Sequence, residues 1–330
     1  MKKKITMQDI ANEVGVSVVT VSNALAGRTG VSPETKDEIL DVSKKLGYEF
    51  KKENKKADKS TRIIGILVAD RFFADNKFYQ DLYRSILLEA NAENCSILLE
   101  IVSPLKEADN IMPSMLETTN KVDGIIFMGE IDRDYLKMVA ESNIPYILLD
   151  FYDYNIPATS IVSDGFEGAY KLTSLAIEKG KESFGFLGTI NSTSSINDRY
   201  LGFYKALLDN GIKINPDWII EDRDARGEFI PIKLPDIIPE VFVCSCDEVA
   251  YRLIEKLKLK AYEIPEEVAV LGYDDNYFAK LARPQLTSYH VDTENMAKNA
   301  LMELAKAIDG EVSNKIITIR GELVERDSLS

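Results

Sequence analysis

The 330-residue sequence has few of the side chains on which metal and acid–base chemistry depend. It contains one histidine, three cysteines and one tryptophan. Because His290 is the single histidine, a histidine-rich metal site is excluded, and histidine-dependent catalysis would rest on one residue. Three cysteines cannot all pair within the chain, which favours reduced thiols in a cytoplasmic protein. Cys244 and Cys246 have no second cysteine pair to complete a metal site, so we expect buried thiols there.

Long apolar runs are also missing. No run reaches the roughly 18 apolar residues that a membrane-spanning helix needs, so we expect no membrane partner. The basic residues 2–4 are followed by a polar segment, so we expect no secretory signal. The composition, 45% hydrophobic and 28% charged, is that of a globular protein of two domains or slightly more.

The charge is unevenly distributed along the chain. The formal net charge is −14, but residues 1–60 contain 12 Lys and Arg against 9 Asp and Glu. The first 60 residues therefore carry +3 and the remainder −17. This asymmetry indicates a basic, polyanion-binding segment attached to an acidic body.

Residues 6–47 have the pattern of three short helices. Thr6 and Asp9 have the spacing of a capping box, and Ser32 before Pro33 is typical of a helix start. A helix-turn-helix needs a small residue where the helices cross and a glycine in the turn, and Ala11 and Gly15 meet both needs. A small helical bundle without a ligand is the alternative interpretation.

This segment resembles the DNA-binding heads of the LacI/GalR repressors. The motifs that carry the resemblance are Gln8-Asp9-Ile10-Ala11, Gly15-Val16-Ser17-Val18-Val19-Thr20-Val21-Ser22-Asn23-Ala24-Leu25, Val31-Ser32-Pro33-Glu34-Thr35 and Leu46-Gly47-Tyr48. The resemblance implies that the second helix enters the major groove of operator DNA. By position, it implies base contacts from Val18, Val19 and Asn23, and phosphate contacts from Ser17, Thr20, Ser22, Thr35 and Tyr48 beside the cap of Thr6. These roles suit the side chains, because hydroxyls and helix N-termini bind phosphate, valine contacts thymine methyls and asparagine pairs with adenine.

Residues 51–61 contain five lysines and no large apolar side chain. Two interpretations remain open. The segment is either a flexible linker or, as the resemblance implies, a hinge helix that forms on DNA. Ala57 is too short to act as the minor-groove wedge that a leucine provides in the resembled family.

From residue 62 onward, short apolar strands alternate with amphipathic helices. This alternation predicts an α/β fold with doubly wound parallel sheets in two lobes. The predicted strands are Ile63–Val68, Ser96–Ile101, Gly124–Met128, Tyr146–Leu149, Ser183–Leu187, Val241–Cys244 and Val268–Leu271. The predicted helices are Phe78–Glu93, Phe166–Glu178, Ile196–Asn210 and Glu248–Leu257.

The resemblance continues through this body, for example at Val122-Asp123-Gly124-Ile125-Ile126, Arg199-Tyr200-Leu201-Gly202-Phe203 and Gly272-Tyr273-Asp274-Asp275. It implies a body like the periplasmic sugar-binding proteins, with a small sugar effector between its lobes and with a homodimer as the functional unit. It implies a DNA-binding domain over 1–50, a linker over 51–61 and an effector-binding and dimerisation domain over 62–330. The chain would cross between lobes near 161, 291 and 322. The first lobe then holds 62–161 and 291–322, and the second holds 162–290 and 323–330.

Ligands of such folds lie at the carboxyl ends of parallel strands. Asp150, Asp247 and Asp274 each follow a predicted strand, and Arg199 opens a helix after another. Carboxylates and a guanidinium suit a neutral polyol, whose hydroxyls both donate and accept hydrogen bonds. Further candidates are the aromatic rings of Phe78 and Tyr79 and, by the resemblance, Ser195 and Asp164. The alternative for each carboxylate is a helix cap or a surface acid.

Enzyme motifs are absent: we find no G-x-G-x-x-G, Walker loop or G-x-S-x-G segment, and we expect neither a cofactor nor a metal. The sequence therefore predicts a cytoplasmic transcriptional repressor that binds double-stranded operator DNA. A sugar-binding protein and a metabolic enzyme, each with a non-functional head, are the alternatives.

Overall fold

The computed structural model describes residues 5–25, 31–46, 48, 61–73, 77–117, 122–311 and 313–330. The chain forms two compact units, residues 1–60 and 61–330, each of which has its own core. Within the described ranges, no helix combines the length and the apolar character needed to cross a membrane.

The first unit is a three-helix head. Thr6 caps its first helix through the predicted capping box, with Thr6 N donating to Asp9 Oδ2 over 2.8 Å. Gly15 ends that helix with a φ of 76°, a conformation that few other residues adopt. The buried core is formed by Ile10, Ala11, Val21, Ala24 and Ile39. The helices are α1 (Met7–Val14), α2 (Val18–Leu25) and α3 (Pro33–Lys45).

Three of the sequence-based expectations fall outside the described part of the head and linker. They concern the end of the second helix after Leu25, the side chain of Val19, and residues 51–60 with both interpretations of the linker.

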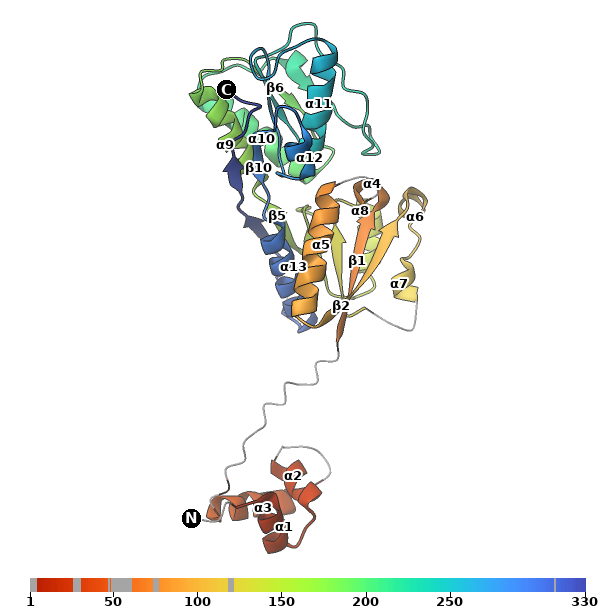
Figure 1. Ribbon diagram of the computed structural model, residues 1–330. Helices are drawn as coiled ribbons and strands as arrows, with labels where there is room; N and C mark the ends of the chain where they lie inside the picture. The colour runs from red at the N-terminus through yellow and green to blue at the C-terminus, as the bar shows by residue number, and fades with distance from the viewer. Residues whose placement is uncertain are drawn as a thin grey trace. The chain divides into compact units, whose positions relative to one another are not determined.

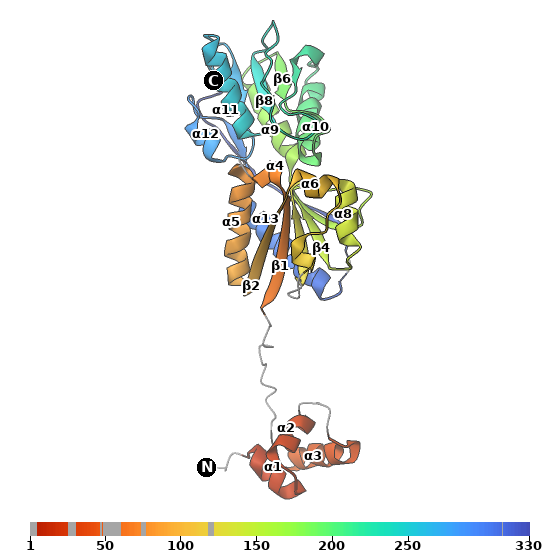
Figure 2. The ribbon, with the colours of Figure 1, turned by 90° about the vertical axis from the view of Figure 1, so that its right-hand side faces the viewer.

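The second unit begins with a parallel six-stranded sheet in the order β11-β5-β4-β3-β1-β2. Alternate residues of β1 face opposite sides, so Ile64 and Ile66 pack in one core cluster and Leu67 in another. Helices α5 and α13 lie side by side on one face, and α8 covers the other (Figures 1 and 2). The strands are β1 (Arg62–Ala69), β2 (Cys95–Val102), β3 (Gly124–Met128), β4 (Tyr146–Leu149), β5 (Thr159–Ser163) and β11 (Ile316–Ile319). The helices are α4 (Asp70–Phe73), α5 (Lys77–Ala92), α6 (Pro104–Ala108), α7 (Ser114–Glu117), α8 (Arg133–Ala140) and α13 (Thr293–Ile308).

A second parallel sheet, in the order β7-β6-β8-β9, forms the other lobe. Figure 2 shows α11 on one side of β6 and β8 and α10 on the other. The strands are β6 (Phe184–Leu187), β7 (Ile219–Ile220), β8 (Val241–Cys244) and β9 (Ala269–Leu271). The helices are α9 (Gly165–Glu178), α10 (Ser194–Asp209), η1 (Pro216–Trp218), α11 (Asp247–Leu259) and α12 (Tyr277–Leu281). Two doubly wound parallel sheets confirm the predicted fold class.

The chain passes between the lobes at three places. It leaves the first sheet after β5, which runs past residue 161 to Ser163, and it returns between β10 (Ser288–His290) and α13. It leaves the first sheet again between β11 and β12 (Glu322–Val324), and β12 pairs antiparallel with β10. Three neighbouring crossings of this kind can act as a hinge between two rigid lobes.

Helices α9 and α10 pack side by side (Figure 1). Gly202 of α10 lies against the backbone of α9. A Cβ placed on Gly202 would lie 2.1 Å from the backbone oxygen of Phe166. In an ordinary helix interior, Gly→Ala stabilises by roughly 1 kcal/mol, because alanine loses less backbone entropy. Here the clash reverses the sign, and we expect Gly202→Ala to lower the free energy of unfolding by about 1–3 kcal/mol.

Urea denaturation followed by circular dichroism measures this effect. Leu208→Ala is the matched control, because Leu208 lies on the same helix and is 56% exposed. We expect that control to stay within about 0.5 kcal/mol of the parent protein. An unchanged or raised stability of Gly202→Ala would contradict the close contact.

Candidate functional site

Polar residues meet where the lobes face each other, at the carboxyl ends of strands from both sheets. Asp150 follows β4 of the first sheet, and Asp274 follows β9 of the second. Both are buried, with 3% and 7% of their surface exposed. The backbone φ is positive at both residues, 67° at Asp150 and 107° at Asp274, so the chain turns sharply at the site.

Arg199 of α10 lies between these carboxylates and is 5% exposed. Its Nη1 donates to the backbone oxygen of Ser245, and its Nη2 lies 3.4 Å from Asp274 Oδ1. Its guanidinium carbon stands 3.8 Å from the ring centre of Tyr273. Although burial opposes it, the negative charge of Asp274 raises the pKa of Arg199 above its ordinary value, so the cation is permanent.

Asp150 connects residues of both lobes. The hydroxyl of Tyr79, on α5, donates to Asp150 Oδ2 over 2.8 Å, and Ser195 Oγ donates to the Asp150 carbonyl over 2.7 Å. Burial raises the pKa of Asp150 to about 6 and that of Asp274 to about 7, although Arg199 opposes both shifts. Near neutral pH these carboxyls are therefore poised between their neutral and charged forms.

Three buried polar atoms of this cluster lack a hydrogen-bond partner within the described structure. They are Asp150 Oδ1, Asp274 Oδ1 and Arg199 Nε. Asp274 Oδ1 still forms an ion pair with Arg199 Nη2, over 3.4 Å. Buried polar atoms without a hydrogen bond cost free energy and mark positions where a ligand or water can complete the bonding. The arrangement offers two acceptors, one from each lobe, and one charged donor, which matches a small molecule with several hydroxyls.

Two other predicted carboxylates form hydrogen bonds within the fold. Asp247 is fully buried, and its two oxygens accept from the backbone N–H of Asn276 and the hydroxyl of Ser288. Asp164 caps α9 by accepting from the N–H of Glu167 over 3.0 Å. Asp164 thus has the bonding of a helix cap through Oδ1, and the ligand interpretation of Asp164 and Asp247 stays a prediction.

The aromatic pair is also more buried than expected. Phe78 and Tyr79 are each 6% exposed, and their ring centres are 5.2 Å apart. Tyr79 presents its hydroxyl to the cluster, and burial together with Asp150 holds the pKa of Tyr79 well above its usual value, so it stays a donor.

A set of hydrogen bonds that was not predicted from the sequence joins the lobes at the start of α10. The N–H of Ser194 donates to Glu130 Oε2 over 2.9 Å, and the hydroxyl of Tyr152 donates to Asp198 Oδ1 over 2.8 Å. Glu130 follows β3 and Tyr152 follows β4, so the strand-end rule that selected Asp150 would also have found them.

The buried pair Asp222 and Arg223, which follows β7, was also not predicted from the sequence. Arg223 Nε and Nη2 donate to the two carboxylate oxygens of Asp222 over 3.1 and 2.8 Å. The two-residue strand β7 gave no periodic signal in the sequence.

In the head, hydroxyl groups gather at helix N-termini. Ser17 Oγ accepts from the N–H of Thr20, and Ser32 Oγ accepts from the N–H of Thr35. Ser22 and Asn23 are half-buried on α2, whereas Val18 and Tyr48 also pack against the head core. These N-termini can bind phosphates, because their orphan N–H groups and helix dipoles favour anions.

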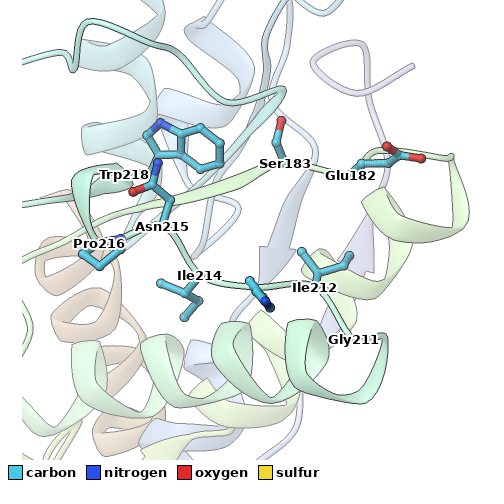
Figure 3. Close-up of a pocket in the computed structure, with 9 residues that line it drawn as sticks. Glu182, Ser183, Gly211, Ile212, Ile214, Asn215, Pro216 and Trp218 are labelled. Carbon is cyan, nitrogen blue, oxygen red and sulfur yellow. The ribbon is translucent and has the colours of Figure 1, made fainter.

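A surface pocket of about 740 Å³ lies elsewhere, at the amino ends of β6 and β7 (Figure 3). Ser183 and Trp218 come directly before those strands, and Ile212 and Ile214 line the pocket with them. The ligand-binding edge of a parallel sheet is the opposite one, so this pocket is separate from the polar cluster.

The chain has relatives along its whole length. Residues 6–49 match bacterial regulatory proteins of the lacI family, and residues 174–329 match a periplasmic binding protein-like domain. The HTH-type transcriptional regulator RegA of Clostridium saccharobutylicum is 30% identical over 337 residues, which covers 98% of each chain. The protein belongs to the LacI family.

Solved structures agree with this LacI-family assignment in fold. The transcriptional regulator CelR in complex with cellobiose has a TM-score of 0.68 at 20% identity and covers 98% of this chain and 99% of its own. The lac repressor dimer bound to operator and the anti-inducer ONPF has a TM-score of 0.67 at 20% identity, covering 99% and 100%. This LacI-family protein is a DNA-binding transcriptional regulator and not an enzyme.

Proposed function

We propose that the protein is a repressor that binds a near-palindromic operator as a homodimer and is controlled by a small sugar or sugar derivative. A single head reads only a half-site, so two-fold symmetric DNA calls for two copies. Residues 1–50 bind DNA, and residues 62–330 bind the effector and dimerise. The lac repressor structure holds operator as a dimer, and CelR holds cellobiose. Because operator DNA is the proposed partner of this protein, we infer that the protein acts in the cytoplasm.

The unsatisfied polar cluster carries the effector assignment. Asp150 belongs to the first lobe, whereas Arg199 and Asp274 belong to the second, so a ligand that bonds all three ties both lobes together. The effector shifts operator binding only by its differential affinity for the two arrangements of the lobes. Ser195, Tyr79 and Phe78 support the cluster.

Selection of operators from random duplex DNA tests the DNA-binding part. We expect a palindromic consensus and an affinity that falls steeply between about 50 and 200 mM salt, because lysines neutralise phosphates. Screening sugars for release of the selected operator then tests the effector part. Salt-independent binding, or selection of no consensus, would reject sequence-specific recognition.

Asn23→Ala should change which operator is preferred. Asparagine pairs with adenine through two hydrogen bonds, and such a pair contributes about 1–3 kcal/mol of discrimination. We expect the variant to lose preference at one base pair of each half-site. Lys55→Ala in the linker is the control, because loss of a phosphate contact weakens all sequences alike. Parallel selections with both variants measure the difference, and an unchanged consensus for Asn23→Ala would remove Asn23 from the reading surface.

A further inference from the structure

A second guanidinium, that of Arg223, lies near Arg199 at the carboxyl ends of the strands of the second sheet. In the sheet order β7-β6-β8-β9, the ends of neighbouring strands supply adjacent residues. Ser245, after β8, joins the two guanidiniums, because its carbonyl accepts from Arg199 and its hydroxyl donates to Asp222 over 3.0 Å. Asp222 in turn holds Arg223 by two hydrogen bonds.

Arg223 belongs to the environment of the polar cluster. The positive charge of Arg223 opposes the rise that burial causes in the pKa of Asp274 and of Cys246. The hydroxyl of Tyr79 in turn contributes to raising the pKa of Arg223. The side chain of Arg223 is 8% exposed. Nε and Nη2 are engaged by Asp222, and Nη1 has no acceptor among the described residues. One donor nitrogen of Arg223 is therefore free to serve a ligand.

The charge of Arg223 is already balanced. Despite the burial of Asp222, its hydrogen bonds with Arg223 and its attraction to that charge hold its pKa below the usual value, so Asp222 is ionised. The N–H of Thr189 and the hydroxyl of Ser245 complete its shell. The charge of Arg199 acts on the carboxyls of Asp150 and Asp274, and that of Arg223 acts on those of Asp222 and Asp274. Each of these two cations therefore already has carboxyl partners among the described residues.

We propose that Arg223 determines effector specificity by donating through Nη1 to a hydroxyl or ring oxygen, and that the site accepts uncharged sugars while rejecting phosphorylated and carboxylated ones. This inference rests on the proposed sugar effector and names its charge class. At pH 8, above the pKa values of Asp150 and Asp274, both carboxyls are ionised. An anionic group would then meet two carboxylates without a compensating free cation, and a buried uncompensated charge is strongly disfavoured.

The test uses the full-length protein and matched sugars at pH 8, where Asp150 and Asp274 are both ionised. Thermal shift assays compare glucose, galactose, fructose and cellobiose with glucose 6-phosphate, galacturonate, fructose 6-phosphate and cellobionate, and calorimetry then measures Kd for each sugar that stabilises. We expect stabilisation by one or more uncharged sugars and none by the charged counterparts. Arg223→Gln should weaken the uncharged ligand on the order of 10- to 100-fold, as for loss of a charged hydrogen bond. Arg226→Gln, on the same loop and exposed, should bind normally.

Asp222→Asn gives a second readout that misfolding does not imitate. It frees the charge of Arg223, so we expect the charged counterpart of the bound sugar to gain affinity relative to the uncharged one by about 10-fold or more. Wild-type binding of a charged sugar at least as tightly as its uncharged form, equal binding by Arg223→Gln, or an unchanged ratio in Asp222→Asn overturns the inference while leaving a sugar effector in place. If no sugar stabilises the wild type, the proposed sugar effector fails and this inference with it.

Discussion

Replacing Arg199 with alanine should abolish the effector response and destabilise the protein. The substitution leaves Asp150 and Asp274 buried without their shared cation. Removing one partner of a buried charge network typically costs about 3–5 kcal/mol. The loss of stability should be smaller at pH 5 than at pH 8, because at pH 5 the two carboxyls can take up protons instead of staying charged.

The pH dependence of the wild type has the same origin. A free aspartate titrates near pH 3.9, at about the value in unfolded chains, whereas Asp150 and Asp274 titrate at about 6 and about 7 in the folded protein. Between roughly pH 4 and pH 7, these two groups bind more protons in the folded state. Their contribution to the free energy of unfolding therefore falls as pH rises through that window. Asp274→Asn removes one titrating group and should flatten the dependence.

Urea denaturation at pH 5 and pH 8, followed by circular dichroism, measures both effects. Arg226→Ala is the control, since Arg226 is exposed and outside the cluster. Effector affinity of folded Arg199→Ala and Asp274→Ala should fall on the order of 30- to 150-fold. Operator affinity without effector should change far less, because neither residue belongs to the head. Wild-type effector responses in both variants would mean that the ligand binds elsewhere.

Replacing Ile39 with alanine should abolish operator binding while sparing the effector site. Ile39 has no exposed surface and packs with Ile10 and Val21 in a head core of few residues. Such a truncation costs about 2–5 kcal/mol, a large share of the stability of a domain this small. The unfolded head presents no helix to the major groove, whereas residues 61–330 keep their own core.

The matched variant Ile39→Val removes one methyl and should cost about 0.5–1.5 kcal/mol, leaving operator binding largely intact. Gel-shift assays with the selected operator and calorimetry with the effector separate the two activities. Normal operator affinity in Ile39→Ala would show that the head core does not support DNA binding, and simultaneous loss of effector binding would show that the two units do not fold independently.

The head was determined almost entirely by local sequence signals. Each signal acts between residues that are close together in the sequence. These signals are the capping at Thr6 and at Ser32, the turn at Gly15 and the apolar spacing around Ile10 and around Val21. Short-range hydrogen bonds and periodicity therefore suffice to place three helices. The buried strands of the body were equally readable, because continuous apolar runs between turn residues are typical of parallel sheets.

Elements with weaker patterns were missed. Three of the five residues of β5 are Ser or Thr, β7 has two residues, and the pairing of β10 with β12 joins segments more than 30 residues apart. The long amphipathic helix α13 carried a periodic signal that the sequence analysis did not use. The crossing after Ser163 depended on where β5 stops pairing with β11, which is a long-range property.

The sequence selected Asp150, Asp247 and Asp274 by one rule, and only the tertiary structure distinguished among them. Asp247 lies at the start of α11, where Asn276 and Ser288 satisfy both oxygens. Asp150 Oδ1 and Asp274 Oδ1 have no hydrogen-bond partner within the described structure, although the latter forms an ion pair with Arg199. Which oxygens are satisfied depends on groups far away in sequence that folding brings within 3 Å. The strand-end rule gives the edge of the sheet from sequence, but burial and hydrogen-bond satisfaction, and with them the residues left to bind a ligand, arise only when the lobes are assembled.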